Sequence, residues 1–294
     1  MAGALRRLAH PGPEAVTRIE AVETDLVAVE GHLPAGTSVM EAVAAFFSER
    51  GLAGGVLRLS GGACDPYRYV LPALSTDGEH AAWYSATIAP AGGARLIEGT
   101  AIVGRRDGVP FLHCHGTWEA DGTVRMGHML PLDSVLTEPV AVSGHASRTA
   151  LFDATPDAET AFTLFSPLGL TAAAPSRPVD RRGLFLRLRP HEDVAGAIAA
   201  ACRRHGVGAA EIHGIGSINE VVFEDGRRVS CLATEIAIEH GVVASGPDGP
   251  VATLDVAVVD IDGAIHRGRL RPGDNPVGVT FELVLVEPFP EEPA

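Results

Sequence analysis

Alternating apolar and polar residues predict two strands joined by a tight turn in the middle of the chain. Residues 111–118 read as one strand and residues 123–130 as its return, with Asp121 and Gly122 between them. An Asp-Gly pair between two alternating runs is a strong local signal for a two-residue β-hairpin. If these two residues form the loop, paired positions add up to 243, as 121 and 122 do, and the register of the hairpin is fixed.

This register gathers three histidines on one face of the hairpin. His115 lies directly opposite His128, His113 is its diagonal neighbour, and Cys114 points to the other face. Three neutral imidazoles suit Zn²⁺ or a similar first-row ion, with a further coordination position open for water or a ligand. Two histidines at a spacing of two on a strand also occur as packing or surface residues. The cross-strand position of His128 is what favours a metal site here.

A helical pattern appears twice in the chain, each time in the same setting. Residues 34–63 and 190–218 align without a gap from Val39 against Val194 onward. Each copy predicts an apolar-periodic helix, a short strand and a glycine turn. A side-chain oxygen precedes each helix and a glycine ends it, as helix caps require. These residues are Ser38 and Gly51 in the first copy, and Asp193 and Gly206 in the second.

The strands after each helix also align between the copies. Residues 108–130 match residues 249–271, and the Asp-Gly turns coincide, while the first copy carries 14 extra residues around positions 67–88. The copies differ where chemistry is expected. The positions of His113, His115 and His128 are taken in the second copy by Leu254, Val256 and Arg269. We therefore expect the metal site in the first copy alone.

Each copy predicts a strand, a helix and then several alternating strands. We expect an α+β fold of two tandem domains, each a mainly antiparallel sheet packed with one principal helix. The segment between them contains many apolar side chains, so we expect an arm packed on a neighbour rather than a free linker. The expected divisions are a tail at 1–17, the domain with the three histidines at 18–146, the arm at 147–181, the degenerate domain at 182–288 and a tail at 289–294.

Composition excludes several classes of function. The 294 residues suffice for two domains, and the net charge of -14 opposes binding to nucleic acid or to an anionic membrane surface. The chain contains no lysine, which excludes Schiff-base chemistry, a P-loop lysine and the carboxylated lysine of an amidohydrolase barrel. No apolar run approaches the roughly 20 residues of a membrane span, and the start of the chain lacks the apolar core of a secretory signal. Four scattered cysteines suit a reducing cytoplasm.

These motifs resemble those of the plant and prokaryote conserved (PPC, also PCC) domain family. That family shows a glycine-rich strand after its helix, a His-x-His strand, an Asp-Gly turn and a Gly-Gly-His sequence. The pattern appears here as His113-Cys114-His115, Asp121-Gly122 and Met126-Gly127-His128, with Met126 in place of the family's first glycine. The resemblance covers residues 18–146 and 182–288, and the second copy matches in its helix, glycine turn and final strand.

The resemblance implies a compact α+β domain that assembles as a trimer, with the three histidines as a metal site near a subunit boundary. For a chain with two copies, we expect three chains that supply six domains. In plants, similar domains accompany AT-hook DNA-binding segments, and this chain has no Arg-Gly-Arg-Pro core of that kind.

Two main functional hypotheses follow. The first is a metal-dependent enzyme, in which Zn²⁺ would polarise a carbonyl or activate water on a small anionic metabolite, in hydrolysis or lyase-type chemistry. Glu119, at the end of the histidine face, is a candidate general base, and Arg269 is a candidate clamp for a carboxylate. The second hypothesis is a non-catalytic module that senses a metal or a small ligand. Direct DNA binding is the third and least favoured, because of the negative charge.

Overall fold

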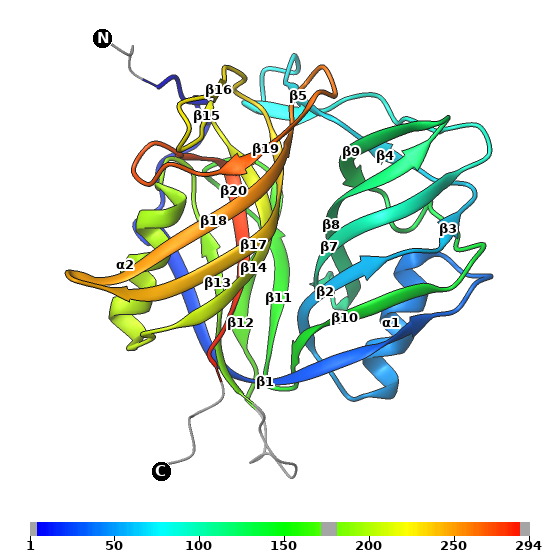
Figure 1. Ribbon diagram of the computed structural model, residues 1–294, viewed down its shortest axis with the longest axis horizontal. Helices are drawn as coiled ribbons and strands as arrows, with labels where there is room; N and C mark the ends of the chain where they lie inside the picture. The colour runs from blue at the N-terminus through cyan, green and yellow to red at the C-terminus, as the bar shows by residue number, and fades with distance from the viewer. Residues whose placement is uncertain (1–4, 172–180, 289–294) are drawn as a thin grey trace.

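The computed structural model describes residues 5–171 and 181–288 (Figure 1). The described residues form mainly antiparallel strands, 16 of which join in one long curled sheet. They include two α-helices, of 11 and 12 residues. The predicted α+β class is therefore wrong, and the fold is a mostly antiparallel β structure.

The first half of the chain contains the elements named from β1 to β10. These are β1 (Ile19–Leu33), α1 (Val39–Glu49), β2 (Gly54–Ser60), β3 (Ala63–Cys64), β4 (Tyr69–Val70), β5 (Pro72–Leu74), β6 (Ala82–Tyr84), β7 (Ala94–Arg106), β8 (Val109–Ala120), β9 (Thr123–Met129) and β10 (Val140–Ser147). Two strands follow, β11 (Ala150–Pro156) and β12 (Thr163–Gly169). The second half contains β13 (Arg181–Leu188), α2 (Val194–His205), β14 (Ala210–Ile218), β15 (Val221–Val222), β16 (Arg228–Val229), β17 (Glu235–Gly246), β18 (Gly249–Val259), β19 (Ile265–Arg269) and β20 (Val277–Val286).

The error in the fold class has a physical origin. Helix caps and helical periodicity are strong local signals, and both predicted helices are present with their caps. Ser38 caps α1 in a capping box with Glu41, and Asp193 caps α2, which ends at Gly206 in the left-handed conformation. The strands are long, however, with 15 residues in β1, 13 in β7 and 12 in β8, and β1 pairs with a strand of each half. The helices are therefore minor parts of a fold dominated by its sheet.

One strand belongs to both halves of the sheet. The first part of β1, residues 19–26, pairs with β13, and the second part, residues 27–33, pairs with β10. The strand order is β1-β10-β2-β7-β8-β9 in the first half and β13-β20-β14-β17-β18-β19 in the second. The two halves thus have the same topology, and β1 makes them parts of one continuous sheet.

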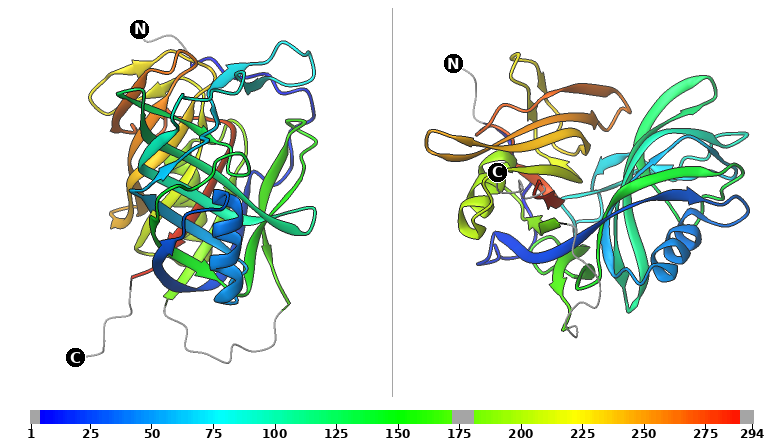
Figure 2. Two further views of the ribbon diagram at one scale, coloured as in Figure 1. Left: turned by 90° about the vertical axis from the view of Figure 1, so that its right-hand side faces the viewer. Right: turned by 60° about the horizontal axis from the view of Figure 1, so that its bottom comes forward.

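Each curled half has one face toward its helix and the other toward the opposite half (Figure 2). Alternation along the strands separates the two faces. In β7, Ala101 and Val103 pack in the core around α1, whereas Ile102 packs in a separate core shared with residues of the second half such as Ile215 and Val284. The second half has its own core around α2. Both faces are therefore apolar in the central strands, with the histidines on the face between the halves.

The predicted hairpin and its register are confirmed. His115 pairs with His128 and Glu119 pairs with Val124, so that paired positions add up to 243. Asp121 and Gly122 have φ angles of 51° and 68°, as the two central residues of a type I′ turn require. Cys114 is buried in the core around α1, on the face opposite the histidines.

Residues 150–169 form a hairpin at the seam between the halves. Strand β11 pairs with β12 and, in parallel, with β7. Phe152 is fully buried and stacks on Phe185 of β13, with ring centroids 4.8 Å apart, and Phe165 belongs to the same core. The rest of the expected arm, residues 172–180, lies outside the described residues, as do parts of both expected tails, residues 1–4 and 289–294.

Two further histidines meet between the halves. The rings of His145 on β10 and His213 on β14 lie 5.7 Å apart. Burial, then the neighbouring His145, lowers the pKa of His213 to about 4, although Glu211 opposes this shift. Burial also lowers the pKa of His145.

Neither the described helix α1 nor α2 is long and apolar enough to cross a membrane.

Truncation of a buried aromatic side chain at the seam between the halves is expected to destabilise the whole protein. Phe152→Ala removes a stacked aromatic ring from a core that both halves share, and should lower the free energy of unfolding by about 3–5 kcal/mol. Urea unfolding measures this change. Val109→Ala is the control, because Val109 is 61% exposed. Equal effects of the two substitutions would contradict the assigned seam.

The histidine pair predicts a loss of stability in acid. The folded state keeps His213 neutral down to a pKa of about 4, whereas the unfolded chain protonates it near the ordinary histidine pKa of about 6.5. Protons therefore favour the unfolded state as pH falls from 6.5 to 4, by up to about 3 kcal/mol. Unfolding free energies of the native chain and of His213→Asn should converge or cross over this interval. A constant difference between the two proteins would contradict the assignment.

Candidate metal centre between the two halves

Three histidines converge on the face of the first half that meets the second. His113 and His115 come from β8 and His128 comes from β9, and one nitrogen of each lies within 4.8 Å of the other two. The Nε2 atoms of His113 and His115 are 2.9 Å apart. His115 is 2% exposed, and the other two rings are half-buried. The hairpin register produces this cluster, as the sequence predicts.

The second half fixes the orientation of two of these rings. The Nδ1 atom of His115 donates to the carbonyl oxygen of Ile236 at 2.9 Å, and Nδ1 of His113 donates to Oε2 of Glu282 on β20 at 2.8 Å. With Nδ1 protonated in a neutral imidazole, Nε2 carries the lone pair. Both Nε2 lone pairs then face each other across 2.9 Å. That arrangement is repulsive unless a proton or a metal ion lies between them, and the outer hydrogen bonds match those of metal-ligating histidines.

A carboxylate of the second half also faces the cluster. The Oε2 atom of Glu235 is 3.6 Å from Nε2 of His115, and its Oε1 atom is 3.7 Å from Nδ1 of His128. Glu235 is buried, and neither its Oε2 atom nor Nδ1 of His128 has a hydrogen-bond partner among the described residues. Buried polar atoms without partners are rare, because each costs free energy. A divalent ion between these atoms would give both of them a partner.

The protonation states of the centre suit a metal. Burial, reinforced by the neighbouring imidazoles, lowers the pKa of His115 and of His128 well below the usual value. Burial raises the pKa of Glu235 well above its usual value. Neutral imidazoles are the form that binds metal, and a bound cation would favour the ionised form of Glu235. The donor set of three imidazoles and one carboxylate therefore fits a first-row divalent ion.

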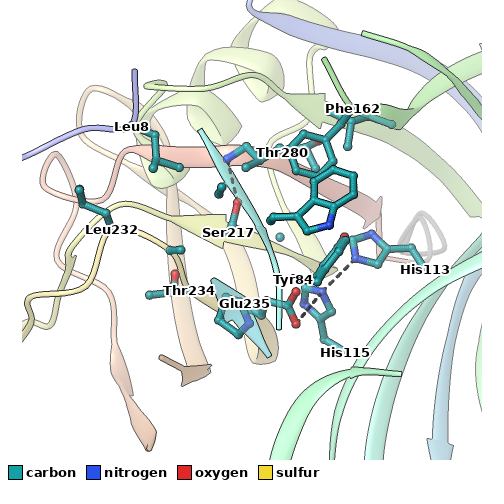
Figure 3. A pocket seen from close by; sticks show the side chains of 17 residues that line it. Leu8, Tyr84, His113, His115, Phe162, Ser217, Leu232, Thr234, Glu235 and Thr280 are labelled. Carbon is teal, nitrogen blue, oxygen red and sulfur yellow. Dashed lines mark hydrogen bonds and ion pairs between the residues drawn. The ribbon is translucent and has the colours of Figure 1, made fainter. Parts of the chain in front are cut away.

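A small cavity of about 60 Å³, partly open to solvent, adjoins the centre (Figure 3). Its wall includes His113, His115 and Glu235. The segment of 14 extra residues in the first copy contributes Trp83 and Tyr84 of β6, and the loop between β11 and β12 contributes Phe162. A second cavity, of about 450 Å³, shares His113, Tyr84 and Phe162 with the first and is of the size of ordinary small-molecule sites.

The aromatic wall reaches the metal centre itself. The ring of Tyr84 lies 4.9 Å from that of His128, and the ring of Trp83 lies 5.1 Å from that of Phe162. Burial raises the pKa of the Tyr84 hydroxyl, so this group stays protonated. Tyr84 therefore offers a neutral, partly apolar surface beside the histidines.

Two residues singled out in the sequence lie away from the cavity. Glu119 shares the histidine face of β8 but is exposed at the end of the strand, and it is not among the residues that line the cavity. Arg269 is held by Asp255 through two hydrogen bonds of 3.0 and 2.9 Å on the surface of the second half. The structure thus brings neither the candidate base nor the candidate clamp to the three histidines.

Glu235 and Glu282 are the site residues that the sequence did not reveal. Both belong to the half that lacks the histidines, and Glu282 lies 169 positions from His113. A charged residue within the apolar strand 277–286 was the one available signal for Glu282. Nothing in the sequence around Glu235 distinguishes it from a surface glutamate.

Comparison with known proteins supports the predicted family for the second half. Residues 177–288 match the family model described as the Plants and Prokaryotes Conserved (PCC) domain. The predicted resemblance is confirmed for this part of the chain. No curated protein matches the chain significantly.

Several solved structures resemble about half of the chain. One is a plant- and prokaryote-conserved (PPC) protein of Pyrococcus horikoshii, with 17% identity and a TM-score of 0.40 over 50% of this chain and 96% of that one. Another is a metal-containing protein of Archaeoglobus fulgidus, with 18% identity and a TM-score of 0.38 over 47% and 92%. A third, named as a candidate DNA-binding protein of Ralstonia eutropha, has 13% identity and a TM-score of 0.37 over 47% and 89%.

The hydrogen bond from His113 to Glu282 is expected to support metal binding. Glu282→Gln keeps the size of the side chain and removes its charge, so affinity for Zn²⁺ should fall by about 10-fold. Competition with a chromophoric chelator measures the affinity. Glu119→Gln is the matched control, since Glu119 is exposed outside the centre, and it should bind as the native chain does. Equal affinities in both variants would remove Glu282 from the centre.

Proposed function

We propose that this chain is a metal-binding PCC-domain protein whose centre, formed by His113, His115 and His128, binds Zn²⁺ and acts on a small molecule in the adjoining cavity. The observation that carries the proposal is the convergence of three imidazole nitrogens within 4.8 Å beside an unpartnered buried carboxylate. Zn²⁺ is chosen because neutral imidazoles and one carboxylate form its usual ligand set. The equal strand order of the halves supports two fused PCC-like copies, of which the first has the histidines.

The reaction class that fits this site is hydrolysis or lyase-type chemistry. A bound Zn²⁺ would supply Lewis acidity toward a carbonyl or carboxylate group, or toward water. The residues of the chain orient the imidazoles and enclose the centre. Glu282 and the carbonyl of Ile236 hold the two imidazoles of β8, while Tyr84 and Phe162 cover the centre and restrict water. Glu235 faces the same space and would balance the charge of the ion.

A non-catalytic sensor is the second candidate function. One observation favours it: the groups around the histidines come from both halves, so that an ion bound there would join them. Metal or ligand binding would then stabilise the contact between the halves without turnover. Screening of small esters and carboxylates for conversion separates the two functions. A molecule that stabilises the protein and is never converted favours the sensor.

Other properties proposed for the chain follow from its composition and family resemblance. We propose a trimer of chains, which light scattering would test. The net charge of -14 opposes nucleic acid as a partner, and binding to duplex DNA at physiological salt would overturn this view. All four cysteines are free, which supports a reducing compartment such as the cytoplasm.

Metal analysis is the direct test of the proposed centre. Protein purified without chelator should contain about one divalent ion per chain, and His128→Asn should retain less than about a tenth of it. His145→Asn is the control, because this half-buried histidine lies in a different cavity between the halves. Absence of metal from the native chain, or equal content in the two variants, would contradict the proposal.

A further inference from the structure

The cavity beside the metal centre has a polar end and an apolar end. His113, His115 and Glu235 occupy one end (Figure 3). Leu8 and Leu232 lie at the side away from the histidines. Leu8 belongs to a small apolar cluster with Ala82 and Ala233, against which Leu232 and Val279 pack. A ligand that reaches from one end to the other thus passes from the metal to hydrocarbon.

The serine and threonine hydroxyl groups of the cavity wall bond to the wall itself. The Thr234 hydroxyl donates to the carbonyl of Ile218 at 2.7 Å, and the Ser217 hydroxyl accepts from the backbone N–H of Val279 at 2.8 Å. The Thr280 hydroxyl donates to Oε1 of Glu282 at 3.3 Å. These side chains stabilise the wall itself. The protons of the Thr234 and Thr280 hydroxyls are thus committed within the wall and are not donated to a ligand.

No cationic side chain lines this cavity among the described residues. Arginine is the one permanent side-chain cation of this lysine-free chain. Arg106 lines the neighbouring cavity, beside Phe111. The guanidinium of Arg106 already has the carboxylate of Asp107 at 3.8 Å. A second anionic group at the apolar end would therefore lie against Leu8, Leu232 and Val279 without a cationic partner, which is unfavourable.

We propose that the ligand of this centre is a small amphipathic monoanion, with a single carboxylate at the metal and a hydrocarbon tail between Trp83, Phe162 and the apolar cluster of Leu8. This inference rests on the proposed metal function and narrows the substrate class. The apolar end selects against dicarboxylates and sugar acids. The rings of Trp83 and Phe162, whose centroids are 5.1 Å apart, cover the tail on one side.

Tryptophan fluorescence gives a direct test. Trp83 is 44% exposed at the cavity, whereas Trp118 is fully buried in the core around α1, so a ligand in the cavity changes the emission of Trp83 alone. Zn²⁺-loaded protein is titrated with hexanoate and with adipate, which differ only in the carboxylate that replaces the terminal methyl. Hexanoate should bind at least about 100-fold more tightly. Comparable affinities would overturn the inference, as would a hexanoate signal that persists in Trp83→Phe.

A variant with altered affinity for adipate tests where the tail of the ligand lies. Leu232→Arg places a cation at the apolar end and should improve adipate binding by at least about 10-fold. Val251→Arg is the matched control, because Val251 is 48% exposed on β18 and does not line the cavity. Improvement in both variants, or in neither, would contradict the assigned orientation.

Neutral 1-hexanol separates this inference from the metal proposal. It should change Trp83 emission in metal-free protein, since the tail site does not depend on the ion. If the chain binds no zinc and hexanol still binds, the apolar site stands and the metal function fails. If zinc binds and neither hexanoate nor hexanol does, the inference fails and the metal centre stands.

Discussion

The pairing of β1 with both halves is the constraint on which the rest of the structure depends. Residues 19–26 of this strand bond to β13 and residues 27–33 bond to β10, so the halves cannot turn freely against each other. Each half curls around its own helix, and its other face must then be buried against the opposite half. The histidines of β8 and β9 lie on that second face. Their environment is thus set by strands that come much later in the chain.

This burial makes the electrostatics of the centre unusual. Three imidazoles and Glu235 share a largely buried space in which no described arginine balances the carboxylate. Without a cation, burial favours neutral imidazoles and a protonated Glu235, and leaves polar atoms unpartnered. With a divalent ion, the carboxylate is ionised and the lone pairs have a common partner. As a packing arrangement alone this geometry costs free energy, because buried polar atoms lack partners. A bound metal ion would remove that cost.

Local rules predicted the parts of the structure that are local. The Asp121-Gly122 turn fixes the register of the hairpin, and period-two alternation then separates Cys114 from the histidines. The two helices follow from their caps in the same way. The fold class failed because the lengths of the strands and the sharing of β1 depend on pairing over long sequence distances, which local periodicity does not report. Glu119 lies on the predicted face but is exposed and outside the cavity. Alternation predicts which face of a strand a side chain is on, but not how much of that face the opposite half buries.

The second half lacks the three-histidine motif but helps to form the centre. The sequence alignment sets Leu254 and Val256 against His113 and His115, but both side chains are buried in the core around α2, on the face that Cys114 occupies in the first half. In the sheet, Asp255 pairs with Arg269 as His115 pairs with His128. Yet its strands β17 and β20 present Glu235 and Glu282 to the histidines of the first half, and the backbone at Ile236 orients His115. Substitutions in the second half can therefore alter the centre as directly as substitutions of the histidines. The two halves share one strand order and are complementary: one supplies the imidazoles, and the other supplies the groups that orient them and face the same space.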